Sequence, residues 1–412
     1  MKERYCAYCT SPIPKTETVC PHCKKELLAA PLNPIDLTPG TVLKGRYVIG
    51  VCLGRGGFGA AYIARDTKRD VPVAVKEYYP SFACDGRTPD GTLIVKPGKN
   101  SEEKFKTFLK HFQKETDILN RLKGVSGVRQ LVDDFDILGT SYQVLEYLDG
   151  MNLSEVIQRQ GRPFSLIDAS VHMQHTLDIL SRVHEKGVLH RDISPDNIFL
   201  CTDGSLRVID FGSAYIIGTQ PEDSFAKAPY TPPEQIQGAA QAPYTDVYAA
   251  GITLFYLLTG RKPNVQIGAS AEKLPEAFST VKDVYMNAVA QNPALRYQTA
   301  ADMRDALAAV SGVSVVPAAV TPQPSQKKKR KVLLPVLLVL LIAVVAMIFM
   351  SISQGDTAPS SAIYTAAPIA TAEPTAPVNE TSSVTETPND SGSSFEQGLT
   401  WSWNDASTSA PQ

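Results

Sequence analysis

Two short stretches decide the fold of this chain: His190-Arg-Asp-Ile-Ser-Pro-Asp-Asn197 and, ten residues later, Val208-Ile-Asp-Phe-Gly212. Both lie in a segment of globular composition that runs from about residue 44 to residue 310. Strand-like runs come first in this segment, at 47–51, 61–64 and 71–76, and long helical patterns follow. Strands followed by helices predict an α+β fold with two lobes.

Upstream of these stretches, Gly54-Arg-Gly-Gly-Phe-Gly59 lies between two of the predicted strands. Its glycines therefore predict a hairpin whose backbone amides can approach phosphate oxygens. A dinucleotide-binding interpretation would need a helix directly after the last glycine, and the strand-like run through Val73-Ala-Val-Lys76 argues against it. Lys76 has the right offset to contact the α- and β-phosphates. A lysine at a strand end is usually only a solvated charge, so this role depends on an acidic partner.

The helical pattern between residues 101 and 122 supplies a candidate partner for Lys76. Glu115 falls on the apolar stripe of this segment, which predicts that it faces the protein and pairs with Lys76. The alternative is a glutamate at the helix edge that reaches solvent. Residues 80–100, between the two, have the composition of an inserted loop. The stripe consists of Phe105, Phe108, Phe112, Leu119 and Leu122.

These stretches, with Pro232-Pro-Glu234 standing where such chains carry Ala-Pro-Glu, resemble the eukaryotic-type (Hanks-type) serine/threonine protein kinase family, and the layout resembles its bacterial, membrane-anchored members. The resemblance implies a small strand-rich N-lobe and a larger helical C-lobe. It also implies ATP and Mg²⁺ (or Mn²⁺) as cofactors and proteins as substrates.

By the same resemblance, Asp192 would accept the proton of the substrate hydroxyl, with Lys76 and Glu115 as the phosphate-holding pair. Asn197 and Asp210 would hold Mg²⁺. Asp246 and an Arg296–Glu234 pair would be structural anchors. The residues that the resemblance assigns to the nucleotide are Leu53, Gly54, Gly56, Gly57, Phe58, Gly59, Ala61, Ala74, Lys76, the gatekeeper Leu145, and Glu146 and Leu148 of the hinge.

The chain departs from the family pattern at two positions. Ser194 stands where these kinases carry lysine, and Lys227 stands where they carry threonine. We hypothesise an exchange in which Ser194 and Lys227 pair beside Asp192 and keep both a hydroxyl and an ammonium at the γ-phosphate. The alternative interpretation is that Lys227 is a solvated loop charge and that Ser194 is a loss of the catalytic lysine, which would give a weak kinase.

The substitution at Ser194 leaves a second function open, a nucleotide-binding pseudokinase that acts as a scaffold. Against it, Lys76, Glu115, Asp192, Asn197 and Asp210 are all present, and we expect an active enzyme that autophosphorylates. Tyrosine specificity is disfavoured by the composition of the catalytic loop. Arg191 before Asp192 resembles kinases switched by phosphorylation, and the available hydroxyls are Ser213, Thr219, Ser224 and Thr231.

At the N-terminus, four of the seven cysteines form two C-x-x-C pairs separated by ten residues. Two such pairs predict one tetrahedral, structural Zn²⁺ site in a zinc ribbon, which could dock a partner. The remaining cysteines are scattered singly, as expected of reduced thiols. A redox role for either pair is disfavoured because no βαβ pattern surrounds it. The predicted zinc ligands are Cys6, Cys9, Cys20 and Cys23.

Near the C-terminus, residues 332–350 are uncharged and apolar over a length that suits one transmembrane helix. The basic run at 327–331 precedes them, and no Lys or Arg follows, so we expect the kinase domain in the cytoplasm and the tail outside. The run also has the composition of a nuclear-localisation signal, a less favoured interpretation. The formal net charge of −2 gives no indication of nucleic acid binding.

The predicted organisation is therefore a zinc ribbon at 1–26, a linker at 27–43, a kinase domain at 44–310, a basic juxtamembrane linker at 311–331, the transmembrane helix at 332–350, and a disordered Ser/Thr/Pro-rich extracytoplasmic tail at 351–412.

Overall fold

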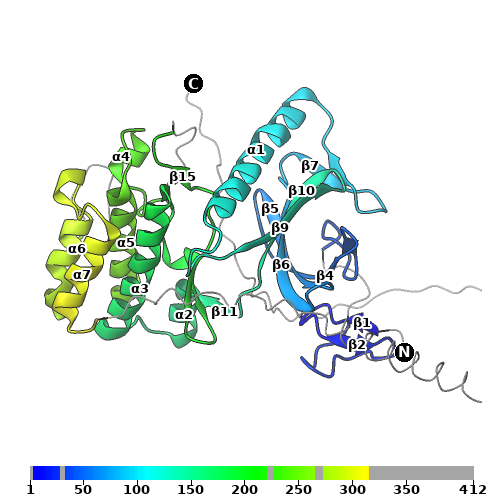
Figure 1. The fold of residues 1–412 in the computed structure, drawn as a ribbon, viewed down its shortest axis with the longest axis horizontal. Coiled ribbons are helices and arrows are strands. Elements are labelled where there is room, and N and C mark those ends of the chain that lie inside the picture. Colours follow the sequence, from blue (N-terminus) through cyan, green and yellow to red (C-terminus); the bar gives the residue numbers. More distant parts are fainter. Residues whose placement is uncertain (1–2, 28–32, 220–226, 265–271, 315–412) are drawn as a thin grey trace, which may run out of the picture. The chain divides into compact units, whose positions relative to one another are not determined.

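The computed structural model describes residues 3–27, 33–219, 227–264 and 272–314. The predicted transmembrane segment at 332–350 and the tail at 351–412 lie outside these ranges, as do residues 315–331 of the juxtamembrane linker. Within the described ranges, every helix is too short or too polar to cross a bilayer. Figure 1 shows the described elements and their labels.

The N-terminal cysteine-rich segment folds around a two-stranded antiparallel sheet of β1 (Glu3–Tyr5) and β2 (Pro12–Pro14). Its small core contains Cys6, Ile13 and Cys20, all nearly fully buried. A core of this size cannot stabilise a fold by hydrophobic burial alone, so the segment depends on a further cross-link between its parts.

The strand-rich lobe is built on a six-stranded antiparallel sheet in the order β3-β4-β5-β6-β10-β9. The predicted strands at 47–51, 61–64 and 71–76 are confirmed within β4, β5 and β6. Each strand buries apolar residues against the others because alternate side chains face the same side. The bounds are β3 (Val42–Leu43), β4 (Tyr47–Gly56), β5 (Gly59–Asp66), β6 (Val71–Tyr78), β9 (Leu131–Ile137) and β10 (Thr140–Glu146).

Part of the segment predicted as a linker belongs to this sheet and its core. β3 pairs with β4, and Leu37 and Leu43 are buried among the side chains of β4, β5 and β6. The fold of the lobe therefore extends N-terminal to the predicted boundary at residue 44. Prolines and polar residues made the stretch resemble a linker, whereas single buried leucines anchor it.

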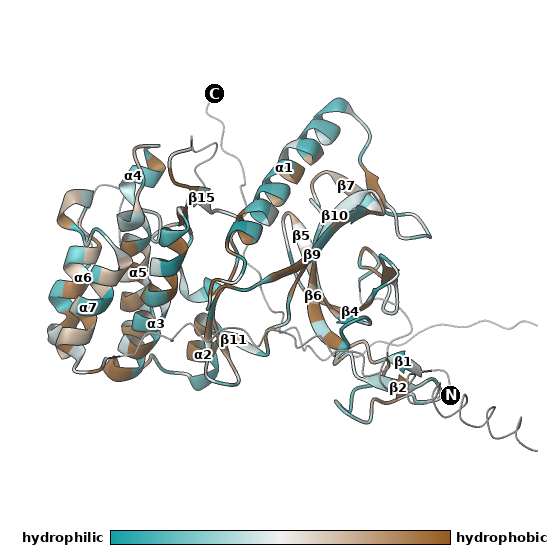
Figure 2. Cartoon of the chain, in the orientation of Figure 1, coloured by the Kyte–Doolittle hydropathy of each residue, from teal (hydrophilic) through white to brown (hydrophobic). Residues whose placement is uncertain are grey.

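Helix α1 (Lys99–Arg121) packs against the sheet through the predicted apolar stripe. Phe105, Phe112, Glu115 and Leu119 are buried, and the outer side of the helix is hydrophilic (Figure 2). The segment before it, expected to be a loop, contains the hairpin of β7 (Cys84–Arg87) and β8 (Leu93–Val95), which shares a small core with α1.

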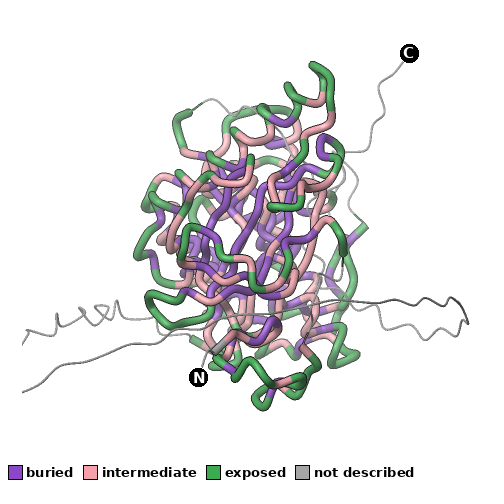
Figure 3. Tube along the Cα trace, turned by 90° about the vertical axis from the view of Figure 1, so that its right-hand side faces the viewer, coloured by how far each residue is buried: buried purple, intermediate pink, exposed green. Residues whose placement is uncertain are grey.

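The second lobe is helical and contains the largest core of the described chain. Its central helix α5 buries residues on all sides, as its apolar sequence requires. Figure 3, seen from the side of the strand-rich lobe, shows buried chain in the interior and exposed chain at the periphery of the molecule. The helices are α2 (Leu153–Gln160), α3 (Leu166–Glu185), α4 (Pro233–Ile236), α5 (Pro243–Thr259), α6 (Lys282–Ala288) and α7 (Ala300–Ser311).

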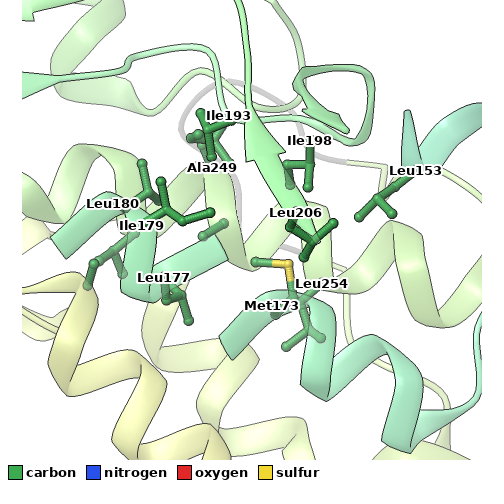
Figure 4. Close-up of a cluster of buried hydrophobic side chains, with 14 of the residues drawn as sticks. Leu153, Met173, Leu177, Ile179, Leu180, Ile193, Ile198, Leu206, Ala249 and Leu254 are labelled. Carbon is green, nitrogen blue, oxygen red and sulfur yellow. The ribbon is translucent and has the colours of Figure 1, made fainter. Parts of the chain in front are cut away.

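Short strands near the lobe junction frame the two stretches that decide the fold. One three-stranded sheet has the order β11-β13-β14, and β12 pairs with β15. Apolar side chains of these strands pack in one core with those of α3 and α5 (Figure 4). Examples are Ile198 and Leu206 of the strands, with Met173 of α3 and Leu254 of α5. The bounds are β11 (Gly150–Asn152), β12 (Val188–Leu189), β13 (Ile198–Cys201), β14 (Leu206–Val208) and β15 (Tyr215–Ile216).

Candidate active site

A cavity lies beneath the glycine-rich hairpin between β4 and β5, and its empty space of about 560 Å³ includes part of the open solvent at its mouth. It reaches β6, α1, β10 and the segment that follows β14. Of the residues that the sequence assigned to a nucleotide, Leu53, Gly57, Phe58, Glu146 and Leu148 do not line this cavity. Those that do are Gly54, Gly56, Gly59, Ala61, Ala74, Lys76 and Leu145.

Phe58, at the tip of the glycine-rich hairpin, packs away from the cavity. Its ring lies 4.6 Å from that of Phe108 on α1 and 5.6 Å from that of Phe82, measured between centroids. This aromatic contact connects the hairpin to α1 and to the inserted segment. The sequence contained no signal for it, because the three residues are separated along the chain.

Lys76 and Glu115 form the buried pair that the helical periodicity predicted. The Nζ atom of Lys76 lies 2.9 and 2.7 Å from the two carboxylate oxygens of Glu115 and 3.8 Å from Oδ1 of Asp210. Burial raises the pKa of Glu115, and the charge of Lys76 opposes this rise. The pair holds the ammonium group at the cavity wall, where a phosphate could reach it.

Arg129 also lines the cavity and was not predicted. It is buried, and its Nε donates to the carbonyl oxygen of Glu146 over 2.9 Å. Burial lowers the pKa of Arg129 to about 10, against the influence of neighbouring carboxylates. A single basic residue ahead of a strand has no local pattern that marks it as part of a site.

Asp192 and Asn197 are joined within the loop between β12 and β13. The Nδ2 atom of Asn197 donates to the Oδ2 and backbone oxygens of Asp192, over 2.8 and 2.7 Å. The other carboxylate oxygen, Oδ1, is buried and accepts no hydrogen bond within the described residues. Burial raises the pKa of Asp192 to about 6, although the charge of Lys227 lowers it. A carboxylate of this kind is suited to accept a proton.

Asp246, at the start of α5, holds the backbone of this loop. Its carboxylate accepts hydrogen bonds from the amides of His190 and Arg191, over 2.8 and 2.7 Å. Arg191 has a positive φ of 65°, which bulky residues rarely adopt, so the loop needs such external support. The anchoring role implied for Asp246 agrees with this geometry.

Glu234 and Arg296 form a buried, bidentate ion pair, with nitrogen–oxygen distances of 2.7 and 2.9 Å. The pair joins α4 to the segment before α7. Neither residue lines the cavity, in agreement with a role in the fold.

Lys227 lies against the catalytic loop as the exchange hypothesis requires. Its Nζ atom is 2.9 Å from Oγ of Ser194, 3.7 Å from Oδ1 of Asp192 and 3.3 Å from Oδ2 of Asp196. Ser194 is fully buried, and Lys227 is only partly exposed. Lys227 is therefore not a solvated loop charge.

The four hydroxyls considered as phosphorylation sites differ in accessibility. Thr219 is exposed, and Ser213 is partly exposed. Thr231 is buried, and its Oγ1 accepts a hydrogen bond from the backbone amide of Lys227 over 2.6 Å. Ser224 lies outside the described residues.

The donor set beside Asp192 fits a hard divalent cation. Asp210 offers a carboxylate, and its backbone has a positive φ of 61° that turns it out of the preceding strand. The amide nitrogen of Asn197 donates to Asp192, so its amide oxygen remains as a ligand atom. Carboxylate and amide oxygens are the ligands that Mg²⁺ prefers.

The four N-terminal cysteines converge as the spacing predicted, with all sulfur atoms within 4.8 Å of one another. The Sγ atoms of Cys6 and Cys23, and those of Cys9 and Cys20, are 3.7 Å apart. Tetrahedral Zn–S bonds of about 2.3 Å imply sulfur–sulfur distances of about 3.8 Å. The geometry therefore fits one Zn²⁺ with four thiolate ligands.

Comparison with known protein families matches residues 47–307 to the protein kinase domain. The serine/threonine-protein kinase PrkC of Bacillus subtilis is 29% identical over 284 residues, covering 64% of this chain and 40% of PrkC. PknA of Mycobacterium tuberculosis, also named a serine/threonine-protein kinase, is 28% identical, covering 66% of this chain and 62% of PknA. The chain thus matches less than two thirds of the length of these relatives.

A solved structure described as the apo form of PpkA-294 is also similar. It superposes with a TM-score of 0.58 at 26% sequence identity, covering 66% of this chain and 99% of that one.

Proposed function

The chain belongs to the protein kinase family, and we propose that it transfers the γ-phosphate of ATP to serine or threonine hydroxyls of proteins, including its own. The relatives named as serine/threonine kinases support this hydroxyl class. The observation that carries the proposal is the buried Oδ1 atom of Asp192, which accepts no hydrogen bond from the described residues and lies next to an ammonium group.

In the proposed reaction, the substrate hydroxyl oxygen forms a bond to the γ-phosphorus. The bond between the γ-phosphorus and the oxygen that bridges the β- and γ-phosphates breaks, and ADP leaves. Asp192 accepts the hydroxyl proton at its carboxylate, which Asn197 orients through Oδ2. Lys76, oriented by Glu115, binds the non-transferred phosphates. Mg²⁺ held by Asn197 and Asp210 would neutralise charge on the β- and γ-phosphates.

Ser194 and Lys227 complete this arrangement as an exchanged pair. The ammonium group of Lys227 lies between the carboxylates of Asp192 and Asp196, a place from which it could bind a γ-phosphate oxygen in the transition state. This contact is an argument against the pseudokinase alternative, which depended on the loss of lysine at position 194.

The experiment is transfer of radiolabelled phosphate from Mg²⁺-ATP by the full chain, compared with Asp192→Asn, followed by phosphoamino-acid analysis. Label on serine or threonine that disappears in the variant is expected. Label on neither chain, with ATP binding retained, would favour the scaffold. Label on tyrosine would contradict the hydroxyl class.

We also propose that the four cysteines bind structural Zn²⁺ and that residues 332–350 anchor the chain in the cell membrane as a single pass. The charge asymmetry around 332–350 supports a cytoplasmic kinase domain and an external tail. Protease added outside intact cells should remove the tail and spare the kinase domain. Digestion of the kinase domain with the tail spared would refute this orientation.

A further inference from the structure

The turns at Cys6–Cys9 and Cys20–Cys23 are the two zinc knuckles, and the first of them makes a direct backbone contact with the strand that carries the glycine-rich hairpin. The carbonyl oxygen of Ala7, between the ligands Cys6 and Cys9, accepts a hydrogen bond from the amide of Val51 on β4 over 2.8 Å. Ala7 is buried in this position. The ring of Tyr5 also lies 5.9 Å from the guanidinium group of Arg65 on β5.

Two features of β4 make this contact possible. The pairing of β4 with β5 shifts register between Ile49 and Cys52, which releases the Val51 amide from the ladder. Gly50 then allows the close approach, since a Cβ atom there would lie 2.3 Å from the Ala7 oxygen and 2.8 Å from Cγ2 of Ile63. The irregularity in β4 thus provides a donor for the knuckle.

The contact lies close to the proposed phosphate-binding glycines. Val51 is three residues before Gly54, which lines the cavity, and β4 continues through Gly56. A hairpin rich in glycine has little conformational restraint of its own, so its position depends on how its flanking strands are held. Fixing Val51 therefore restrains one flank of the hairpin.

A second connection from the same N-terminal side reaches the hairpin itself. The carboxylate of Asp36, in the segment after the cysteines, pairs with the guanidinium group of Arg55, between Gly54 and Gly56. Both side chains are largely shielded from solvent, at 7% and 22% exposure, and Arg55 also stacks on Tyr79. Pairs shielded in this way are weakened less by solvent than surface pairs.

We infer that the zinc ribbon is a positioning element of the nucleotide site: Zn²⁺ folds the knuckle, the knuckle holds β4 through Ala7 and Val51, and the glycine-rich hairpin is thereby preorganised for ATP. Metal binding supplies the folding free energy of a segment with so small a core. Loss of the metal releases Val51 from the knuckle and leaves this flank of the hairpin less restrained, so ATP must order the hairpin as it binds. The ribbon acts in cis, in addition to any partner that it docks.

This inference rests on the proposed ATP site and is tested first by nucleotide affinity. ATP binding by the full chain is compared with and without zinc. A chelator removes the zinc, and the chelator is then washed out before Mg²⁺-ATP is added. We expect ATP to bind about five- to tenfold more weakly without zinc. This is the effect of losing the net free energy of one hydrogen bond that is coupled to nucleotide binding. KM for ATP should rise by the same factor while kcat at saturating ATP changes less than about twofold.

Amide hydrogen exchange supplies a readout that does not depend on activity. Residues 50–56 should exchange faster after zinc removal, whereas α5 in the helical lobe should not change. Cys9→Ser should reproduce the effect, and Cys201→Ser, outside the knuckles, should not.

A second variant breaks the contact while zinc stays bound. Gly50→Ala in an Ile63→Ala background removes the clash with Cγ2 of Ile63. It leaves the severe clash with the Ala7 oxygen at 2.3 Å and a milder contact with the Ile63 backbone oxygen at 3.0 Å, and Ile63→Ala alone is its matched control. The double variant should keep its zinc and lose ATP affinity. Equal ATP affinity and equal exchange at 50–56 in all forms would overturn the inference. A chain that binds ATP in no form would instead refute the proposed function.

Discussion

The Nζ atom of Lys227 lies 2.9 Å from the Oγ atom of Ser194, and the same ammonium group is 3.7 Å from the carboxylate of Asp192. A hydroxyl and an ammonium group therefore meet beside the proposed base, although each comes from the position where the family pattern carries the other. Residues 33 positions apart in the sequence compensate for each other at one point in space.

The first prediction concerns this exchange. Lys227→Ala should lower kcat by about 30- to 160-fold, because it removes roughly 2–3 kcal/mol of charge stabilisation at the transferred phosphate. Restoring the family arrangement with Ser194→Lys and Lys227→Thr together should recover most of this loss. Steady-state phosphate transfer measures both.

Ser194→Lys alone places two ammonium groups together and should be less active than the double variant. Lys68→Ala, at an exposed lysine of the other lobe, is the control for removing a charge and should match the native chain. A double variant no better than Lys227→Ala would refute the exchange.

The second prediction tests the buried pair of Lys76 and Glu115. Glu115→Gln should lower kcat/KM for ATP by about 10- to 100-fold, because the lysine then turns toward Asp210, 3.8 Å away, and leaves the phosphates. Initial rates over a range of ATP concentrations provide the measurement. Glu102→Gln removes an exposed carboxylate from the same helix and should have no effect. Equal losses in the two variants would show that the pair has no specific role.

The third prediction is a pH dependence. Asp192 must be ionised to accept a proton, and its pKa is raised to about 6, so kcat/KM should rise through pH 6. At about one pH unit below the pKa, only about a tenth of the chains carry the ionised base.

Because the charge of Lys227 lowers the pKa of Asp192, Lys227→Ala should move this midpoint to higher pH. The profile of Lys68→Ala should coincide with that of the native chain. An unmoved midpoint in Lys227→Ala would mean that another group controls the acid limb.

The fourth prediction concerns stability. Arg296→Ala should lower the free energy of unfolding by about 3–5 kcal/mol, because it leaves the buried carboxylate of Glu234 without its cation. Urea denaturation followed by circular dichroism measures the change. Arg261→Ala removes an arginine of a solvent-exposed pair, at 53% side-chain exposure, and should lower the free energy of unfolding far less. Similar losses for both arginines would contradict this account.

The sequence alone determined the elements whose chemistry is local. The stretches at 190–197 and 208–212 carry their acidic and amide residues at fixed short spacing, and a helical stripe identified Glu115 as facing the protein. The two C-x-x-C pairs likewise predicted the convergence of four sulfur atoms. Each of these inferences needs only the geometry of a turn or of one helix.

Tertiary structure decided what depends on contacts between distant segments. Leu37 and Leu43 join the lobe core although prolines surround them, Arg129 lines the cavity, and Val51 donates to Ala7. No sequence periodicity marks such residues. A single buried side chain or a single unpaired amide has a role only because another segment of the folded chain contacts it. The sequence therefore determined which chemical groups this protein carries, whereas packing decided that its zinc knuckle would touch the strand beside its nucleotide site.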